Sequence, residues 1–297
     1  MYDVIIVGGG PAGLSAALVL GRCLRKVLIC DSGHPRNASS SAIHGYLTRD
    51  CTPPQEFLSI ARQELVPYGV EWMTTQITTA IRYDDCFELA TTNNQLLRCR
   101  KLLLATGLKD YLPEIPGVQD FYGKSVHHCP YCYGWEVRNQ PLAVYGLGKV
   151  GIGLSLSLKT WSPDVTLCTD GTKRLHAEEL DRLERNGIQL ITTKISRLAG
   201  QNGQLERIVF TDGSSLSCRA MFFALGTVQH SNLALQLNSE FTRRGVVKSD
   251  KLQKTNVPGL FVAGDAARDM QQVIVAAAEG AKAAIAINME FQEEGRK

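Results

Sequence analysis

The sequence predicts an α/β protein made of two Rossmann-like, three-layer nucleotide-binding domains, with the second domain inserted in the first. Two glycine runs, at residues 8–13 and 146–151, each follow an apolar segment and share the spacing G-x-G-x-x-G. Each run leads into helix-like text and a further apolar segment, and each half closes on Ala-x-Gly, at residues 105–107 and 224–226. One plan that occurs twice indicates two domains of the same type.

In the first half, residues 2–7 are dense in β-branched residues and predict a buried parallel strand. A helix over residues 14–22 and a second strand over residues 26–30 follow, and Asp31 ends that strand. After a polar loop we expect a helix near residues 54–68. Short strands are then expected at residues 72–78, 85–91, 95–99 and 101–104.

The second half repeats this order, with a strand over residues 142–145, a helix after the glycine run and a strand over residues 165–168. An amphipathic helix is expected over residues 176–186. The remaining strands are expected at residues 188–193, 195–199, 205–211, 215–218 and 222–225.

Residues 241–297 fit neither copy as a third domain. They hold a strand over residues 260–263 and an alanine-rich helix over residues 272–291, which we expect to complete the first sheet. The first domain is therefore predicted to be discontinuous, over residues 1–115 and 241–297, and the second to cover residues 116–240.

Composition narrows the class of protein. Charged residues make up 21% of the 297 positions and the net charge is +3, without the clustered basic stripe of a nucleic-acid-binding protein. No run of about 18 apolar residues exists, so no membrane span is expected, and the apolar N-terminus lacks the basic leader of a signal peptide. Seven of the nine cysteines are scattered and do not resemble a secreted disulfide framework, which favours a cytoplasmic location.

The first glycine run indicates a dinucleotide phosphate site. Gly8 suits a tight turn, Gly10 the close approach of a pyrophosphate, and Gly13 close packing of helix on strand, while the helix N-terminus attracts the phosphates. Asp31 stands 18 residues after Gly13, where its carboxylate can accept hydrogen bonds from ribose hydroxyls.

A cysteine pair lies between the two glycine runs. Cys129 and Cys132 are separated by two residues and can close into a small disulfide ring and open again. Beside a redox cofactor, such a ring is a two-electron relay. Zinc binding through the pair and His127 or His128 is the weaker interpretation, because adjacent histidines point apart and no second C-x-x-C occurs, so no metal is expected. An inert, packed pair is the other alternative.

The segment over residues 255–265, TNVPGLFVAGD, resembles the second FAD signature of the pyridine nucleotide-disulfide oxidoreductases, in which the aspartate binds the ribityl chain. With the first glycine run and residues 105–107, the resemblance covers essentially the whole chain. The short form, with its cysteine pair ahead of the second glycine run, resembles the low-molecular-weight thioredoxin reductases. This resemblance implies FAD as the cofactor. The residues that it assigns to FAD are Gly8, Gly10, Pro11, Ala12, Gly13, Asp31, Arg36, Asn37, Ala105, Thr106, Gly107, Gly264, Asp265, Gln272 and Val273.

The resemblance also implies roles for the two sulfurs. Cys132 is expected to accept electrons next to the flavin, and Cys129 to attack a partner disulfide. Thioredoxin reductases usually place an acidic residue after the second cysteine, but this chain has Tyr133, whose reference pKa of about 10 makes it a poor acid. His128, or else His127, is expected to take over the proton. The following Gly-Trp-Glu resembles a branch that includes fungal dithiol oxidases, which usually have histidine in place of Tyr133.

The second glycine run departs from the NADPH-dependent members, which carry G-x-G-x-x-A and a later His-Arg-Arg cluster. Here Gly151 ends the run, and Asp170 follows the second strand, where an acid repels a 2′-phosphate. Lys173 and Arg174 stand close by as compensating cations. We expect NADPH to be a poor donor, which leaves NADH, or a ferredoxin-like iron–sulfur donor with no pyridine nucleotide, so whether NAD(P)H is a cofactor stays open.

The predicted function is that of an FAD-dependent disulfide oxidoreductase resembling thioredoxin reductase, which passes two electrons to the disulfide of Cys129 and Cys132 and on to a thioredoxin-like protein. The resemblance further implies a homodimer and a swivel between domains, placed near residues 113–118 and 238–243. Two alternatives remain: a dithiol oxidase that forms a disulfide in a small molecule with oxygen as acceptor, and a non-enzymatic flavin redox sensor.

Overall fold

The computed structural model describes residues 1–172 and 175–295. The chain divides into two compact units. The first comprises Met1–Ala38, Gly45–Lys109 and Thr227–Lys297, and the second comprises Ser39–His44 and Asp110–Gly226. The predicted architecture, in which one Rossmann-like domain is inserted in another, is confirmed.

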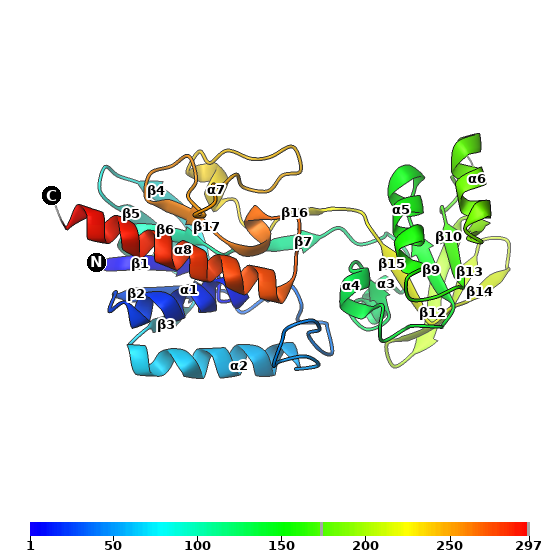
Figure 1. Cartoon of the computed structure of the whole chain (residues 1–297), viewed down its shortest axis with the longest axis horizontal. Helices are drawn as coiled ribbons and strands as arrows, with labels where there is room; N and C mark the ends of the chain where they lie inside the picture. Colours follow the sequence, from blue (N-terminus) through cyan, green and yellow to red (C-terminus); the bar gives the residue numbers. More distant parts are fainter. Residues whose placement is uncertain (173–174, 296–297) are drawn as a thin grey trace. The chain divides into compact units, whose positions relative to one another are not determined.

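The first unit is built on a parallel sheet in the order β3-β2-β1-β6-β17 (Figure 1). Its central strand β1 (Tyr2–Val7) lies between β2 (Val27–Asp31) and β6 (Leu96–Leu104). The edge strands are β3 (Glu71–Thr74) and β17 (Leu260–Val262). Because β17 pairs with β6, the C-terminal segment completes the first sheet, as the sequence predicts.

Helices α1 (Pro11–Arg22), α2 (Pro54–Leu65) and α8 (Val273–Glu294) cover one face of this sheet, and α2 continues into the short 3₁₀ helix η1 (Val66–Tyr68). The core on this face joins alternate β1 residues to apolar side chains of the helices. This alternation is the period of two that a strand buried on both faces must have.

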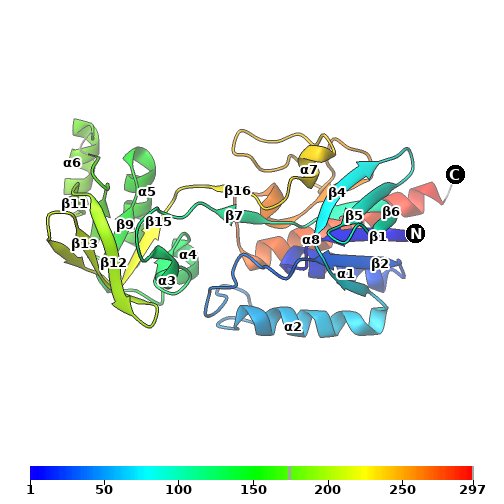
Figure 2. The same ribbon diagram turned by 180° about the vertical axis from the view of Figure 1, so that it is seen from behind.

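The opposite face carries β4 (Ile77–Arg82) and β5 (Phe87–Thr91), which form an antiparallel meander with the first half of β6 (Figure 2). The short helix α7 (Leu233–Gln236) packs there too. The single segment expected over residues 72–78 is in fact the end of β3 and the start of β4, with a turn between them.

The second unit repeats the arrangement with a parallel sheet in the order β11-β10-β9-β15-β8. These strands are β11 (Gln189–Ile191), β10 (Val165–Cys168), β9 (Leu142–Tyr145), β15 (Ala220–Phe223) and β8 (Val126–His127). The edge strand β8 precedes the rest of its sheet in the chain, whereas β17 follows the rest of the first sheet.

Helices α5 (Gly148–Leu158) and α6 (Ala177–Arg185) cover one face of the second sheet. The antiparallel strands β12 (Ile195–Gln201), β13 (Gln204–Phe210) and β14 (Ser215–Ser217) cover the other face, together with the short helix α3 (Val118–Phe121). The expected amphipathic helix over residues 176–186 matches α6, with His176 and Asn186 as its caps.

The unit boundaries differ from those expected. The second unit ends at Gly226 rather than at residue 240, because β16 (Thr227–Gln229) pairs with β7 (Leu108–Asp110) and α7 packs on the first sheet. The Gln236 side chain accepts from the backbone N–H of Ala80 at 3.0 Å, which fixes α7 against β4. The sequence also did not predict that Ser39–His44 would belong to the second unit.

No helix among the described residues is both long enough and apolar enough to cross a membrane.

Candidate active site and cofactor site

The first glycine run forms a tight crossing between β1 and α1. Gly8 has a positive φ of 111°, and a Cβ there would lie 2.2 Å from the carbonyl oxygen of Ala105, so only glycine fits. A Cβ on Gly13 would lie 1.9 Å from the carbonyl oxygen of Gly8. In contrast, a Cβ on Gly10 would meet no atom within 4 Å. The backbone at Gly10 therefore borders open space, which fits the close approach of a phosphate.

Helix α1 begins beside that open space. Gly10 is its N-cap and Pro11 its first residue, and no side chain caps this helix end. The first N–H groups of a helix have no partner within the helix, and the helix dipole makes this end positive. A pyrophosphate is the kind of group that such an end binds.

Asp31 lies at the end of β2, next to the glycine run. Its Oδ1 accepts from the N–H of Gly9 at 2.9 Å, and its Oδ2 lies 3.4 Å from a guanidinium nitrogen of Arg62. The Arg62 guanidinium is stacked over the ring of Trp72, 4.1 Å from its centroid. Sequence reasoning missed Arg62 and Trp72, because nothing in their spacing connects them with the glycine run.

The C-terminal signature places Asp265 in the same unit. Gly264 has a φ of +76°, and the carboxylate of Asp265 accepts from Nη1 of Arg36 at 2.9 Å, with both side chains largely buried. The structure thus brings together two residues that the sequence assigned to FAD from positions 229 apart. Asn37, half-buried, directly follows Arg36.

The other residues assigned to FAD lie on connections within the same unit. Ala105, Thr106 and Gly107 directly follow β6, and the N–H of Ala105 donates to the carbonyl of Val7 at 2.8 Å. Helix α8 has Gln272 as its N-cap and Val273 as its first residue. Ala12 lies within α1, where α8 packs.

The second unit holds the cysteine pair. Cys129 and Cys132 form a disulfide with an S–S distance of 2.02 Å, at the start of the short helix α4 (Pro130–Tyr133). Cys129 is the N-cap of α4 and both cysteines are only partly buried. Tyr131, between them, is 74% exposed. The pair is therefore accessible, which disfavours the inert, packed alternative.

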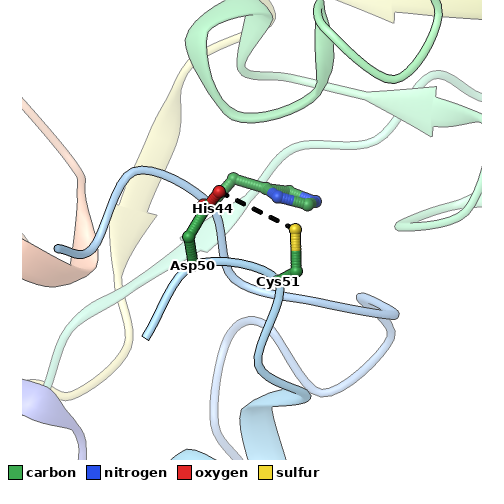
Figure 3. Close-up of side chains that lie close together, drawn as sticks. All are labelled: His44, Asp50 and Cys51. Atoms are coloured by element: carbon green, nitrogen blue, oxygen red, sulfur yellow. Dashed lines mark hydrogen bonds between the residues drawn. The ribbon is translucent and has the colours of Figure 1, made fainter. Parts of the chain in front are cut away.

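The seven other cysteines among the described residues form no disulfide. Burial raises the pKa of the thiols of Cys30, Cys99, Cys168 and Cys218 to about 12, so these thiols stay protonated and unreactive. Cys51 is exposed, and its Sγ donates to a carboxylate oxygen of Asp50 over 3.7 Å (Figure 3).

The two histidines before Cys129 differ sharply. His127 is 2% exposed, its ring stacks on Tyr133 with 3.9 Å between centroids, and burial, assisted by the neighbouring His128, lowers its pKa to about 3. His127 is therefore neutral near pH 7. His128 is partly exposed, and its Nδ1 lies 3.9 Å from a carboxylate oxygen of Asp110.

Asp110 also accepts from the hydroxyl of Tyr122 at 2.8 Å, and that hydroxyl lies 3.5 Å from Nδ1 of His128. A carboxylate that faces a histidine orients its ring and stabilises its charged form. Sequence reasoning missed Asp110 and Tyr122, because they stand 18 and 6 residues before His128 with no recognisable motif.

Tyr133 occupies the position of the usual acidic residue. Burial raises its pKa above the ordinary value, and its hydroxyl lies 3.5 Å from the carbonyl oxygen of Ala42. The ring of His44 meets it edge-on at 5.7 Å between centroids. Tyr133 is therefore covered by residues 39–44 and is a weaker acid than a free tyrosine, consistent with the expectation that it cannot supply the proton.

The second glycine run also connects a strand to a helix, but the residue at the end of the next strand differs from that in the first unit. In the first unit Val7 pairs with Cys30 and Asp31 comes next; in the second, Tyr145 pairs with Cys168 and Thr169 comes next. Thr169 is 1% exposed and donates its hydroxyl to the carbonyl of Thr172 at 2.6 Å. The position of the ribose-binding acid is therefore a buried threonine.

Asp170 stands one residue further on, which corrects the sequence-based view that it ends the strand as Asp31 does. Its carboxylate accepts from the N–H of Ile195 at 2.7 Å and lies 3.4 Å from the hydroxyl of Tyr145. The carboxylate is thus occupied by protein groups. The compensating cations Lys173 and Arg174 lie outside the described residues.

Comparison with known proteins agrees with this geometry. The family model described as pyridine nucleotide-disulphide oxidoreductase matches residues 2–280. The chain is 30% identical to a probable thioredoxin reductase of Arthroderma benhamiae, over 99% of this chain and 81% of that protein. It is likewise 30% identical to the thioredoxin reductase aclD of Aspergillus oryzae, over 100% of this chain and 99% of that protein. The structure of a putative thioredoxin reductase TrxB from Bacillus anthracis superposes with a TM-score of 0.94 at 32% identity, covering 99% of both chains.

The chain therefore belongs to the pyridine nucleotide-disulphide oxidoreductase family. Its relatives define the type more closely, as a flavoprotein disulfide oxidoreductase that is similar to thioredoxin reductases. This is the enzyme class that the sequence predicts, and it speaks against the non-enzymatic sensor.

Proposed function

We propose that the chain binds FAD in its first unit and uses Cys129 and Cys132 to exchange disulfides with a thioredoxin-like protein. The observation that carries this proposal is the accessible disulfide at the start of α4, beside a histidine that faces a carboxylate. The buried thiols of Cys30, Cys99, Cys168 and Cys218 have pKa values of about 12, which makes them poor candidates for exchange.

The residues of the first unit fit FAD. The open backbone at Gly10 and the uncapped start of α1 suit its pyrophosphate, and Asp31 suits a ribose. Asp265 suits the ribityl chain, and its carboxylate pairs with Arg36, which is a candidate for the flavin or its phosphates. FAD would supply the two-electron couple that returns the disulfide to the dithiol.

In the proposed exchange, the thiolate of Cys129 attacks one sulfur of the partner disulfide, and a mixed disulfide forms as the partner's other sulfur leaves. The thiolate of Cys132 then attacks Cys129, the internal disulfide closes, and the partner leaves with its second sulfur reduced. Each departing thiolate needs a proton. We propose that His128, which precedes Cys129 in the chain and faces Asp110 and Tyr122, delivers it.

The proposed donor is not NADPH. Thr169 at the strand end is buried and Asp170 is held by Ile195 and Tyr145, so neither residue offers a positive charge to a 2′-phosphate. NADH and a ferredoxin-like iron–sulfur protein are the two donors that we propose to compare.

A second candidate, a dithiol oxidase with oxygen as acceptor, is favoured by one observation. Tyr133 is covered and its pKa is raised, so the site lacks the acid that usually assists reduction of a protein disulfide. In this candidate a small dithiol attacks the internal disulfide and leaves as a disulfide, and the two electrons pass to oxygen.

The experiment is an anaerobic titration of the oxidised protein with NADPH, NADH and reduced ferredoxin, followed by flavin absorbance. Bleaching by NADH or ferredoxin, followed by reduction of added thioredoxin, supports the proposal. Rapid bleaching by NADPH contradicts the interpretation of the second glycine run. In a separate aerobic assay, peroxide formation from a dithiol and oxygen, without thioredoxin reduction, selects the oxidase.

We further propose a cytoplasmic homodimer whose units change orientation during turnover. The chain crosses between units at residues 38–39, 44–45, 109–110 and 226–227, and the hinges expected near residues 113–118 and 238–243 lie beyond the last two of these crossings. Identical solution scattering from oxidised and reduced protein would contradict such a change.

A further inference from the structure

The turn that carries Asp265 is bonded to a buried ionic cluster of Glu279 and Arg268, which has no role in the proposed exchange. The N–H of Gly264 donates to Oε2 of Glu279 at 3.0 Å. Glu279 lies on α8, is 7% exposed, and its other carboxylate oxygen accepts from Nε of Arg268. A buried carboxylate needs such partners, because an unpaired charge away from water is strongly destabilising.

Arg268 connects this cluster to the sheet. Its Nη1 donates to the hydroxyl of Ser249 at 3.1 Å and its Nη2 to Oε1 of Gln253 at 2.9 Å. Gln253 is fully buried, and its carbonyl accepts from the N–H of Val262 in β17 at 3.0 Å. The guanidinium therefore joins α8, β17 and the 3₁₀ turn η2 (Gly264–Ala267).

The opposite side of the same turn faces the proposed cofactor residues. Asp265 pairs with Arg36 at 2.9 Å, and a Cβ added to Gly264 would lie 2.9 Å from Cβ of Ala12 in α1. The turn has little room to shift toward α1. The hydrogen bond from the N–H of Gly264 to Glu279 ties the turn to α8.

We propose that Glu279 and Arg268 are positioning residues for the cofactor, which set the direction of the Asp265 carboxylate through the peptide of Gly264. The inference rests on the proposed FAD site. Neither residue touches the reacting atoms. A pair that acted only on stability would leave FAD affinity unchanged once the protein is folded.

The test measures FAD dissociation from the full-length protein by flavin fluorescence, beside thermal unfolding of the FAD-free protein. Glu279→Gln is expected to weaken FAD binding about tenfold, the loss typical of one charge-assisted hydrogen bond. Glu290→Gln is the matched control. It removes a carboxylate from the same helix, three turns away, where Glu290 pairs with Lys101 and Lys254. This control is expected to lower the unfolding temperature and leave FAD affinity unchanged.

A double variant separates positioning from packing. In an Asp265→Asn background, Glu279→Gln is expected to weaken FAD binding less than twofold further, because both changes act through one carboxylate. Wild-type affinity in Glu279→Gln, or the same tenfold loss in the Asp265→Asn background, would overturn the inference. Failure of the wild-type protein to bind FAD would instead overturn the proposed function. If Glu279→Gln does not fold, Arg268→Lys, which keeps a cation beside Glu279, is measured against the same two outcomes.

Discussion

In the first unit, the pairing of β1 with β2 ends at Val7 and Cys30, and the next residue, Asp31, accepts a hydrogen bond from the glycine run. In the second unit, the pairing of β9 with β10 ends at Tyr145 and Cys168, and the next residue, Thr169, is buried and donates a hydrogen bond within its own turn. Four parallel strands follow the same order in both units, β3-β2-β1-β6 in the first and β11-β10-β9-β15 in the second, and the glycine spacing is the same. A glycine run therefore specifies a strand-to-helix crossing, whereas the residue at the next strand end differs between the two units. We propose the FAD site for the first unit, and the cysteine pair lies in the second.

The largest effect expected from this division is that of Cys132→Ser. Without the resolving sulfur, turnover with a disulfide substrate should fall by about 10³-fold or more. The FAD content should stay at the wild-type level, because Cys132 lies in the second unit. Activity assays and flavin absorbance of the same preparation check the expected loss of turnover and the expected retention of FAD. Loss of FAD from this variant would contradict the assignment of FAD and the cysteine pair to separate units.

His128→Asn should come next. It removes the group proposed to move protons in the exchange, and general acid catalysis contributes about 10²-fold or more. Stopped-flow measurement of disulfide exchange checks it. An unchanged rate would move the role to another residue.

Gly10→Ala and Gly148→Ala form a matched pair across the two glycine runs. A Cβ meets no protein atom within 4 Å at either position. At Gly10 the added methyl group would occupy the space proposed for the pyrophosphate, so FAD affinity should fall at least about tenfold. At Gly148, whose φ is +48°, the methyl group should cost about 1 kcal/mol of stability and leave FAD bound. Equal losses of FAD would contradict the comparison.

The pH dependence of the second unit should follow His127. Its folded pKa of about 3 lies below the unfolded value of about 6.5, so the unfolded state binds the extra proton between these values. Stability should therefore fall as pH drops below 6.5, by up to about 1.4 kcal/mol per pH unit. Denaturant unfolding at pH 7 and pH 5 checks this, with His127→Phe expected to flatten the slope.

The smallest effect should come from Asp170→Asn. The variant weakens the hydrogen bond to Ile195 and should lose about 1 kcal/mol of stability. It should not gain activity with NADPH, because Asp170 is held by protein groups. Rapid reduction of this variant by NADPH would instead show that the Asp170 carboxylate excludes NADPH by repelling its 2′-phosphate.

The sequence alone predicted the parallel strands and their helices well, because apolar runs followed by glycine spacing leave few alternatives. It predicted Asp31 and Asp265 through local motifs. It did not predict that Arg36 and Asp265 would pair, or that Arg62, Asp110 and Glu279 would join the sites, because these contacts link distant positions. Strands β7, β8 and β16 were missed because each is only two or three residues long.

Ser39–His44 makes the chain leave the first unit and return within six residues, and this excursion covers Tyr133. The cysteine-bearing unit is consequently not a cassette that can be cut out at two points. A chimera that transplants only residues 110–226 into another scaffold lacks residues 39–44, so the ring of Tyr133 becomes exposed to solvent. A transplant that includes both residues 39–44 and residues 110–226 keeps the Tyr133 ring covered.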